Sequence, residues 1–334
     1  MDTEALNKIF REFNDLKALI IGDVMIDAYL WGNVTRISPE APVPIVAVNR
    51  RENRLGGAAN VALNIQSLGA IPILCSVIGE DKKSNLFLEL LEKQKLTDKG
   101  ILSHPERITT VKTRIIGNNH QMLRVDSENE NESSNEATGL LFERVKSIIN
   151  SDKIDVIIFE DYDKGVITSA LIEKTIALAK EKGIPVAVDP KKRNFMAYKE
   201  VSLMKPNIKE LKEGLKLDFN QHSQDELFSA VKELRATLKL DFALVTLSEK
   251  GILAATNKET VIVPAHIRDI ADVSGAGDTV ISVAALCLAL KLPPVTIASL
   301  ANLAGGLVCE YIGVAPVNKE QLYQEALQFG FISY

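Results

Sequence analysis

The sequence predicts an α/β fold, with a mostly parallel central sheet covered by helices on both faces and a small additional sheet. Buried strand patterns alternate with helix patterns along most of the 334 residues, as in βαβ units. Two other stretches alternate apolar and polar residues, which is typical of half-exposed antiparallel strands. Hydrophobic residues make up 46% of the chain and charged residues 25%, the composition of a folded globular protein.

The predicted elements of the large sheet follow one another in βαβ order. The first 17 residues have the pattern of a charged amphipathic helix. Residues 18–30 (ALIIGDVMIDAYL) predict a buried strand, residues 56–70 a helix that begins at two glycines and ends at Gly69, and residues 71–79 the next strand. The same alternation returns in DVIIFEDYDKG, SALIEKTIALAKEKG, IPVAVDPKK and FALVTLSEKG.

The two alternating stretches are residues 43–57 and 109–128. The second has Gly117, Asn118 and Asn119 at its centre, where a hairpin turn is expected. Because covers that exclude water from an active site are commonly separate mobile elements, these strands predict a lid over a substrate cleft. We expect one domain, 1–334, with lid segments at about 28–55 and 107–127.

Charge and cysteine content exclude several classes of function. The 44 acidic and 39 basic residues give a net charge of −5, which does not favour nucleic acid or an anionic membrane as a partner. The three cysteines lack the spacing of a zinc or redox site and are expected to be buried thiols. No apolar run reaches the ~20 residues of a membrane span, and the N-terminus lacks a signal-peptide pattern. We therefore predict a cytoplasmic protein with a small-molecule partner.

The stretch DVSGAGDTVISVAALCLAL, residues 272–290, places a glycine turn before the most apolar helix pattern. Glycines let the main-chain N–H groups of Gly275, Ala276 and Gly277 approach an anion at a helix N-terminus. A carboxylate beside a bound phosphate would repel it, so Asp278 is interpreted as a base that accepts the proton of an attacking hydroxyl. The alternative is structural, because Asp is also a common helix N-cap.

Other glycine-containing motifs do not fit the same residues. GAGDTV lacks the third glycine of the dinucleotide-binding fingerprint, and the chain has no G-x-x-x-x-G-K-S/T sequence. Asp272 stands where a G-x-S-x-G elbow around Ser274 needs glycine. A Rossmann oxidoreductase, a P-loop enzyme and a serine hydrolase are therefore not supported.

DVSGAGDT resembles the C-terminal signature of the ribokinase-like (pfkB-type) carbohydrate kinases, and RLGGAANVALNIQSLGA resembles their N-terminal glycine motif. The resemblance covers essentially the whole chain, because GDVMIDAYLWGNVTRISPEAPVPIV, DYDKG, VDPKK, KPNIKEL and VTLSEKG are also similar to this family. TRISPEAPVP is similar to the heptose-7-phosphate kinase branch, the kinase half of bifunctional heptose kinase/adenylyltransferases. The resemblance implies a ribokinase-like fold.

The resemblance also implies roles for individual residues. Asp278 would deprotonate the sugar hydroxyl, while the amides of Gly275, Ala276 and Gly277 stabilise the transferring phosphoryl group. The residues implied to hold sugar hydroxyls are Asp27, Gly56, Gly57 and Asn60. The residues implied to arrange Mg²⁺ and phosphates are Asn207 and Glu210, with Glu210 acting indirectly on the metal. The residues implied to line the nucleotide are Ser248, Glu249, Lys250, Gly251 and, near the adenosine, Asn302.

A sugar phosphate requires a second anion site, away from the transferring phosphoryl group. Arginine suits forked phosphate contacts and lysine supplies a point charge. Arg36 and Arg124 in the lid strands, and Lys191 just past a strand, are the candidates, with a purely solvated role as the alternative.

The predicted function is transfer of the ATP γ-phosphoryl group to the anomeric hydroxyl of D-glycero-D-manno-heptose 7-phosphate, which gives the 1,7-bisphosphate for ADP-heptose and lipopolysaccharide core synthesis. The alternatives are another pfkB-type sugar or sugar-phosphate kinase, and a non-catalytic sugar- or nucleotide-binding regulator. ATP and Mg²⁺ are the implied cofactors. A monovalent cation such as K⁺ is left open, because Val314 and Ala315 stand where the family has G-T and a polar residue.

Two expectations concern partners. The chain ends at Tyr334 without a second domain, so a kinase alone is expected, with a separate nucleotidyltransferase acting later in the pathway. One face of the predicted lid sheet is apolar, and a partner commonly covers such a face, so we expect a homodimer through the lid.

Overall fold

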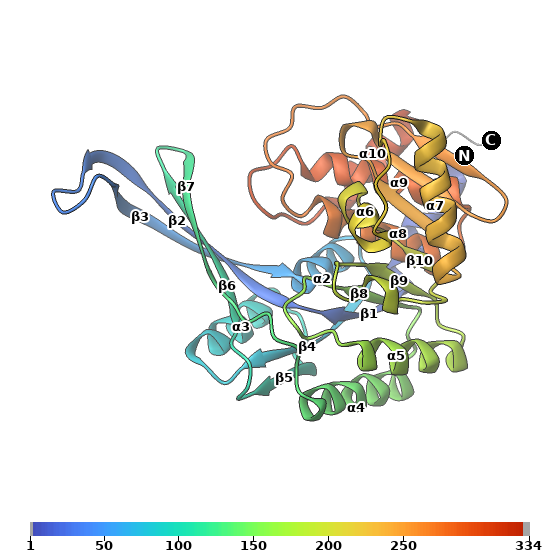
Figure 1. Cartoon of the computed structure of the whole chain (residues 1–334), viewed down its shortest axis with the longest axis horizontal. Coiled ribbons are helices and arrows are strands. Elements are labelled where there is room, and N and C mark those ends of the chain that lie inside the picture. The colour runs from blue at the N-terminus through green and yellow to red at the C-terminus, as the bar shows by residue number, and fades with distance from the viewer. Residues whose placement is uncertain (1–2, 330–334) are drawn as a thin grey trace.

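The computed structural model, which describes residues 3–329, consists of a nine-stranded sheet between two layers of helices and a four-stranded sheet that projects from this body (Figure 1). The strand order of the large sheet is β13-β12-β11-β10-β9-β8-β1-β4-β5. Neighbours from β11 to β5 run parallel, and β12 and β13 are antiparallel additions at one edge. The strands are β1 (Lys17–Gly22), β4 (Ile71–Gly79), β5 (Gly100–His104), β8 (Val156–Glu160), β9 (Val186–Asp189), β10 (Leu203–Met204), β11 (Phe242–Thr246), β12 (Ile252–Ala255) and β13 (Thr260–Val263).

Helices cover both faces because the buried strands carry apolar side chains on both sides. In β1, Ala18 and Ile20 belong to one core, and Leu19 and Ile21 to the other. The first core is covered by α1 (Thr3–Glu12), α2 (Ala58–Ser67), α3 (Lys82–Lys93), α8 (Ala276–Ala289), α9 (Pro294–Val308) and α10 (Lys319–Phe329). The second is covered by α4 (Asn135–Ser151), α5 (Ser169–Lys182), α6 (Ile208–Leu215) and α7 (Gln224–Leu238).

Helix α8 is apolar on all sides because it packs against α2, α9 and the strands. Three short 3₁₀ segments complete the helical structure: η1 (Phe13–Asp15), η2 (Phe195–Ala197) and η3 (Ser248–Lys250). Cys75, Cys287 and Cys309 are buried and unpaired, as predicted. Within residues 3–329, no helix has the length and apolar character of a membrane span.

The second sheet has the order β3-β2-β6-β7 and projects from the body (Figure 1); we call it the lid because it contains the predicted lid segments. Its strands are β2 (Val24–Ile37), β3 (Pro44–Gly57), β6 (Thr110–Gly117) and β7 (His120–Ser127). Asn118 and Asn119 connect β6 to β7 with positive φ angles of 51° and 65°, which confirms the predicted turn.

Two details of the predicted strands were wrong. The lid sheet was expected to be antiparallel, but it is mixed, because β2 and β6 pair in parallel. After β3 the chain passes through the body, and β6 then enters the lid in the same direction as β2. The single strand expected at residues 18–30 is divided at Asp23 into β1 and β2. The buried carboxylate of Asp23 accepts hydrogen bonds from three amides of the segment after β8, which holds the chain at the point where it leaves the large sheet.

Candidate active site

Asp278 lies in the first turn of α8, above the carboxyl ends of the central strands. Gly275, with a φ of 83°, is the N-cap of this helix and supplies no side-chain cap. The alternative role of Asp278 as N-cap is therefore wrong. Among the described residues, the amides of Gly277 and Asp278 have no main-chain or side-chain acceptor. The glycine turn thus leaves N–H groups free at the start of α8, but the amide of Ala276, one of the three predicted donors, is bonded to the main-chain oxygen of Val273 over 3.3 Å.

The carboxylate of Asp278 is held between two donors from other elements. Asn60 Nδ2 in α2 donates to Oδ2 over 2.7 Å, and Tyr162 Oη donates to Oδ1 over 2.7 Å. Asp278 is only 4% exposed, and this burial raises its pKa from 3.8 to about 6, although the hydrogen bonds from Asn60 and Tyr162 oppose the shift. A carboxyl with a pKa near 6 is mostly ionised at neutral pH and readily accepts a proton.

Charged side chains end three adjacent strands beneath Asp278. Glu160 ends β8 and lies opposite Asp189, which ends β9, so both side chains point to the same face of the sheet. Lys205 follows β10, and its Nζ lies 2.8 Å from Asp189 Oδ2. Carboxylate oxygens of Glu160, Asp189 and Asp278 all lie within 4.8 Å of one another, and we call these three residues the acidic cluster.

The acidic cluster contains buried acceptors without hydrogen-bond partners among the described residues. Both carboxylate oxygens of Glu160 and Oδ1 of Asp189 are buried and receive no hydrogen bond from any described residue. Burial, followed by the negative charges of Asp189 and Asp278, raises the pKa of Glu160 well above its usual value. Sequence reasoning missed Glu160, Asp189 and Lys205. The available signal was a charged residue directly after an apolar strand in IIFEDYDKG, VAVDPKK and SLMKPN.

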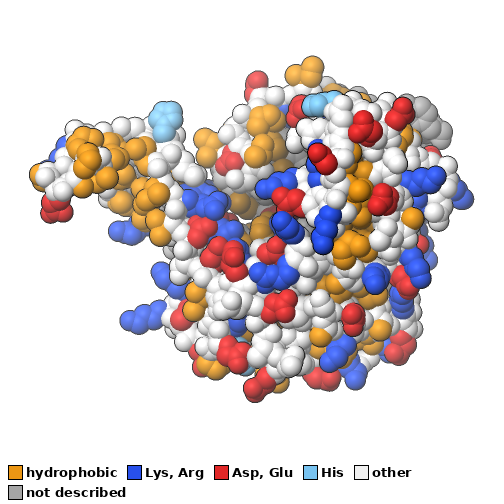
Figure 2. Space-filling view, viewed as in Figure 1, with side chains coloured by type: hydrophobic (Ala, Val, Ile, Leu, Met, Phe, Trp, Pro, Cys, Tyr) orange, Lys and Arg blue, Asp and Glu red, His pale blue; other side chains and the backbone are white. Residues whose placement is uncertain are grey.

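The predicted sugar-binding residues gather where the lid joins the body. Figure 2 shows acidic and basic side chains concentrated in this region. Asp27 of β2 is buried and forms an ion pair with Arg114 of β6, which sequence reasoning missed. Gly57 has a φ of 60° at the start of α2, which favours glycine, and a side chain at Gly56 would displace the Asp27 carboxylate. Asn60, one turn later, faces Asp278.

The three candidates for a second anion site lie in different places. Lys191 forms an ion pair with Glu210, and its ammonium lies 5.6 Å from the centre of the Tyr162 ring. Burial alone would lower the pKa of Lys191, but Asp189 and Glu210 raise it above the usual value. The other two candidates do not lie beside Lys191 and Glu210. Arg36 is exposed near the far end of β2, and Arg124 is exposed beside its ion-pair partner Asp126.

A cavity of about 600 Å³ adjoins the glycine turn and contains most of the predicted nucleotide residues. Apolar side chains, including Ile267, Ile270 and Val273, form part of its wall, as expected for a site that takes a flat base. The predicted residues that line it are Ser248, Glu249, Gly251, Ala276, Gly277 and Asn302.

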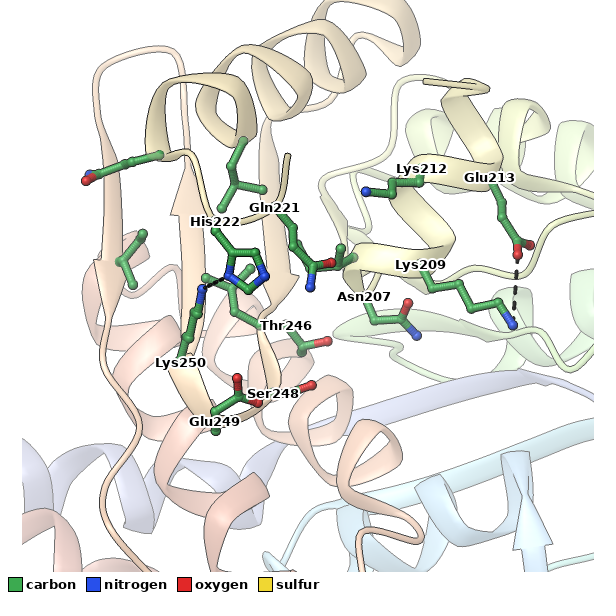
Figure 3. A pocket seen from close by; sticks show the side chains of 15 residues that line it. Asn207, Lys209, Lys212, Glu213, Gln221, His222, Thr246, Ser248, Glu249 and Lys250 are labelled. Carbon is green, nitrogen blue, oxygen red and sulfur yellow. Dashed lines mark hydrogen bonds and ion pairs between the residues drawn. The ribbon is translucent and has the colours of Figure 1, made fainter. Parts of the chain in front are cut away.

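A second cavity, of about 890 Å³, lies on the other side of Ser248 and Glu249 (Figure 3). Lys250, predicted to lie along the nucleotide, lines this cavity instead, and its Nζ lies 2.9 Å from His222 Nδ1. Asn207 also lines it. The larger cavity does not reach the glycine turn, so the smaller one is the better match for a nucleotide that delivers its phosphates to Asp278.

Asn207 and Glu210 of the N-x-x-E motif form a capping box at the start of α6. Asn207 Oδ1 accepts from the amide of Glu210, and Glu210 Oε2 accepts from the amide of Asn207 over 2.9 Å. The remaining oxygen of Glu210 is occupied by Lys191. The motif therefore fixes the start of a helix beside the acidic cluster.

This fold and this site together define a class of protein, the carbohydrate kinases. The family model of the pfkB family carbohydrate kinases matches residues 15–321, and the chain belongs to this family. The predicted family and enzyme class, a phosphotransferase, are thereby confirmed.

The chain is similar over most of its length to proteins named "Bifunctional protein HldE". It is 39% identical over 325 residues to the protein of Syntrophotalea carbinolica, covering 97% of this chain and 66% of that protein. It is 40% identical over 307 residues to the protein of Methylobacillus flagellatus, covering 92% of this chain and 62% of the relative. The chain thus spans just under two thirds of the length of these relatives.

Solved structures share the fold at low identity. Phosphofructokinase-2 from Escherichia coli in complex with substrates and products aligns with a TM-score of 0.77 and 18% identity, over 94% of this chain and 98% of that one. Arabidopsis thaliana ribokinase complexed with ribose and ATP aligns with a TM-score of 0.69 and 15% identity, over 92% and 99%. The predicted ribokinase-like fold is confirmed.

Proposed function

We propose that the chain transfers the γ-phosphoryl group of ATP to the anomeric hydroxyl of D-glycero-D-manno-heptose 7-phosphate, giving the 1,7-bisphosphate. The observation that carries the proposal is the buried Asp278 carboxylate, which two donors hold beside free helix amides. The similarity of TRISPEAPVP to the heptose-7-phosphate kinase branch and the relatives named HldE support the choice of sugar. Use of ATP supports the predicted cytoplasmic location.

The proposed mechanism assigns each step to residues of this chain. Asp27, Asn60 and the neighbouring main chain at Gly56 and Gly57 hold the sugar between the lid and α8. Asp278 accepts the proton of the anomeric hydroxyl as its oxygen bonds to phosphorus and the bond to ADP breaks. The free amides at the start of α8 and the helix dipole stabilise the charge on the transferring group. Positioning and electrostatics account for most of the rate of such transfers.

The residues present fit a divalent cation. Mg²⁺ prefers oxygen ligands and keeps several waters. The unpartnered oxygens of Glu160 and Asp189 would face such an ion, whereas both oxygens of Glu210 are already bonded to Asn207 and Lys191, so Glu210 would act on it indirectly. Bound Mg²⁺ would neutralise phosphate charge.

Arg36, Arg124 and a site for K⁺ stay predictions. A separate nucleotidyltransferase that uses the product also stays a prediction, and the word bifunctional in the relatives' name supports it.

An assay with a panel of acceptors tests the proposed function. The purified chain is incubated with ATP, Mg²⁺ and heptose 7-phosphate, fructose 6-phosphate, ribose or no sugar, and ADP and the phosphorylated carbon are measured by coupled assay and ³¹P NMR. We expect the highest kcat/KM with heptose 7-phosphate and a new phosphate at C1. Faster turnover of another sugar would identify a different pfkB-type kinase. Binding of ligands without ADP release in any arm would identify a regulator.

We also propose that two copies of the chain associate through the lid. Exposed apolar side chains gather on the projecting sheet, where Figure 2 shows a hydrophobic patch. Large patches of this kind are commonly covered by a partner. The exposed apolar residues of the lid are Ile37, Val43, Val48, Met122, Leu123 and Val125.

Leu123→Arg should convert the dimer to a monomer, because it places a charge in the proposed apolar interface. Leu123 is 55% exposed, so the variant is expected to fold. Light scattering should give twice the chain mass for the wild type and one chain mass for the variant. Leu140→Arg is the matched control, since Leu140 in α4 of the body is 53% exposed. A monomeric wild type, or a dimeric Leu123→Arg variant, would contradict the proposed interface.

A further inference from the structure

The segment DYDKG directly after β8 resembles the family, but the predicted function gives it no role. In the structure its tyrosine, Tyr162, reaches the proposed base. Asp278 Oδ1 accepts the hydroxyl of Tyr162 over 2.7 Å, while Oδ2 accepts Asn60 Nδ2 over the same distance. The two oxygens of the carboxylate are therefore held by donors from two different elements, α2 and the segment after β8. Only Asn60 belongs to a motif with a predicted role in sugar binding.

Tyr162 is itself fixed by its surroundings. The carboxylate of Asp23 accepts the amide of Tyr162 over 2.9 Å, and the amides of Lys164 and Val166 over 3.1 and 3.0 Å. This network holds the segment in a single path out of β8. Two cations lie near the ring, because the ammonium groups of Lys112 from the lid and Lys191 from the segment after β9 are each 5.6 Å from its centre. The hydroxyl is thus presented from a rigid support.

Resting on the proposed kinase function, we propose that Tyr162 is a positioning residue, whose hydroxyl keeps the Asp278 carboxylate in the orientation that accepts the sugar proton. The proton of the anomeric hydroxyl passes to the carboxylate, the sugar oxygen bonds to the γ-phosphorus, and the bond to ADP breaks. Tyr162 keeps its own proton throughout. The hydroxyl of Tyr162 donates its proton to Asp278 Oδ1, so Tyr162 is the donor to the base and not the base.

The contacts of Tyr162 distinguish this role from substrate binding. The hydroxyl of Tyr162 is already committed to Asp278, and the ring is already in contact with two lysines. Loss of the hydroxyl alone leaves the ring, its neighbours and the Asp23 network in place. It leaves Oδ1 of Asp278 without its donor, so the carboxylate is restrained only at Oδ2, by Asn60. Misorientation of a base affects the chemical step more than it affects binding of either substrate.

The test is Tyr162→Phe, measured by steady-state kinetics with ATP and the best sugar acceptor. A hydrogen bond to a charged group contributes about 1.5–3 kcal/mol, so kcat should fall about 10- to 150-fold. KM for both substrates should stay within about threefold of the wild type, since no substrate contact is removed. The melting temperature should fall by no more than it does in the control variant described below, because Phe retains the ring and each change removes one hydrogen bond to a buried carboxylate.

Tyr198→Phe is the matched control. It removes the same hydroxyl from a buried tyrosine that donates to Asp161 Oδ2 over 2.8 Å, next to the same segment but away from Asp278. We expect it to lower the melting temperature and leave kcat unchanged. Equal losses of kcat in the two variants would show that Tyr162 acts only through the stability of the segment, and would overturn the proposal.

Two further outcomes complete the test. A Tyr162→Phe enzyme with wild-type kcat, or one in which only the KM for the sugar rises, would overturn the positioning role. Asp278→Asn distinguishes this failure from failure of the proposed function. If Asp278→Asn loses turnover and Tyr162→Phe does not, only the role of Tyr162 is wrong. If Asp278→Asn retains turnover, the proposed base and the inference built on it are both wrong.

Discussion

Asp278→Asn should lower kcat by about 10²–10⁴-fold, the usual contribution of a general base. The side chain keeps its shape but loses the ability to accept the proton of the sugar hydroxyl. The fold should tolerate the change. The NH₂ group of the new asparagine would face the donors that now bind the carboxylate. If the amide of Asn60 rotates, its Oδ1, which has no hydrogen-bond partner, can accept from this NH₂ group. Steady-state kinetics and ligand titrations of the variant measure the two effects separately.

The same carboxylate should set the acid limb of the pH profile. Asp278 must be ionised to act, and burial raises its pKa to about 6, so wild-type kcat should fall as the pH decreases through this value. The small residual rate of Asp278→Asn should lack this limb, because the variant has no carboxyl group at that position. Near-normal turnover in Asp278→Asn, or a wild-type rate that is constant down to pH 5, would contradict the assignment of Asp278 as base.

Lys205→Met should reduce the free energy of unfolding by about 3–5 kcal/mol, the cost of removing one partner from a buried ion pair. Both members of the pair are almost fully buried, and Lys205 Nζ lies 2.8 Å from Asp189 Oδ2. Burial alone would lower the pKa of Lys205, but Asp189 and Glu210 raise it, which shows that the site favours a positive charge. Without Lys205, the acidic cluster retains only the more exposed Lys191, whose Nζ lies 4.0 Å from Asp189 Oδ1, to balance its charge.

The loss of stability should be smaller at acid pH. The pKa of Glu160 is raised well above its usual value, so this carboxyl binds its proton more tightly in the folded state than in the unfolded state. Lowering the pH therefore favours the folded state and reduces the repulsion that Lys205→Met leaves behind. Urea unfolding at pH 8 and pH 5.5 measures this change. Lys232→Met, at an exposed lysine of α7, is the control and should change stability by no more than about 0.5 kcal/mol.

A loss below about 1 kcal/mol in Lys205→Met at both pH values would show that the pair is not a net source of stability, as is found for some buried ion pairs. An equal loss at both pH values would show that the acidic cluster does not gain protons in this range. The kinetics of the variant are informative as well. Lys205 lies close to Gly277 of the glycine turn, so kcat should also fall.

Much of the site was predictable because its signals are local in sequence. The glycine turn and the apolar helix that follows it are contiguous, and together they identify an anion-binding helix start with a carboxylate. The paired glycines before α2 likewise indicate close approach of the main chain, and Gly56 does lie against Asp27. Periodicity distinguished buried parallel strands from the half-exposed strands of the lid.

The sequence by itself determined the α/β class, the existence of a second sheet, the turn that begins α8 and the chemistry available at Asp278. Each of these depends on neighbours within about one turn or one hairpin. Tertiary structure alone decided that Tyr162 and Asn60 hold the two oxygens of Asp278, that Glu160, Asp189 and Lys205 meet beneath it, and that Arg114 pairs with Asp27. These contacts depend on the order of strands in the two sheets, and that order is set by packing between segments far apart in the chain.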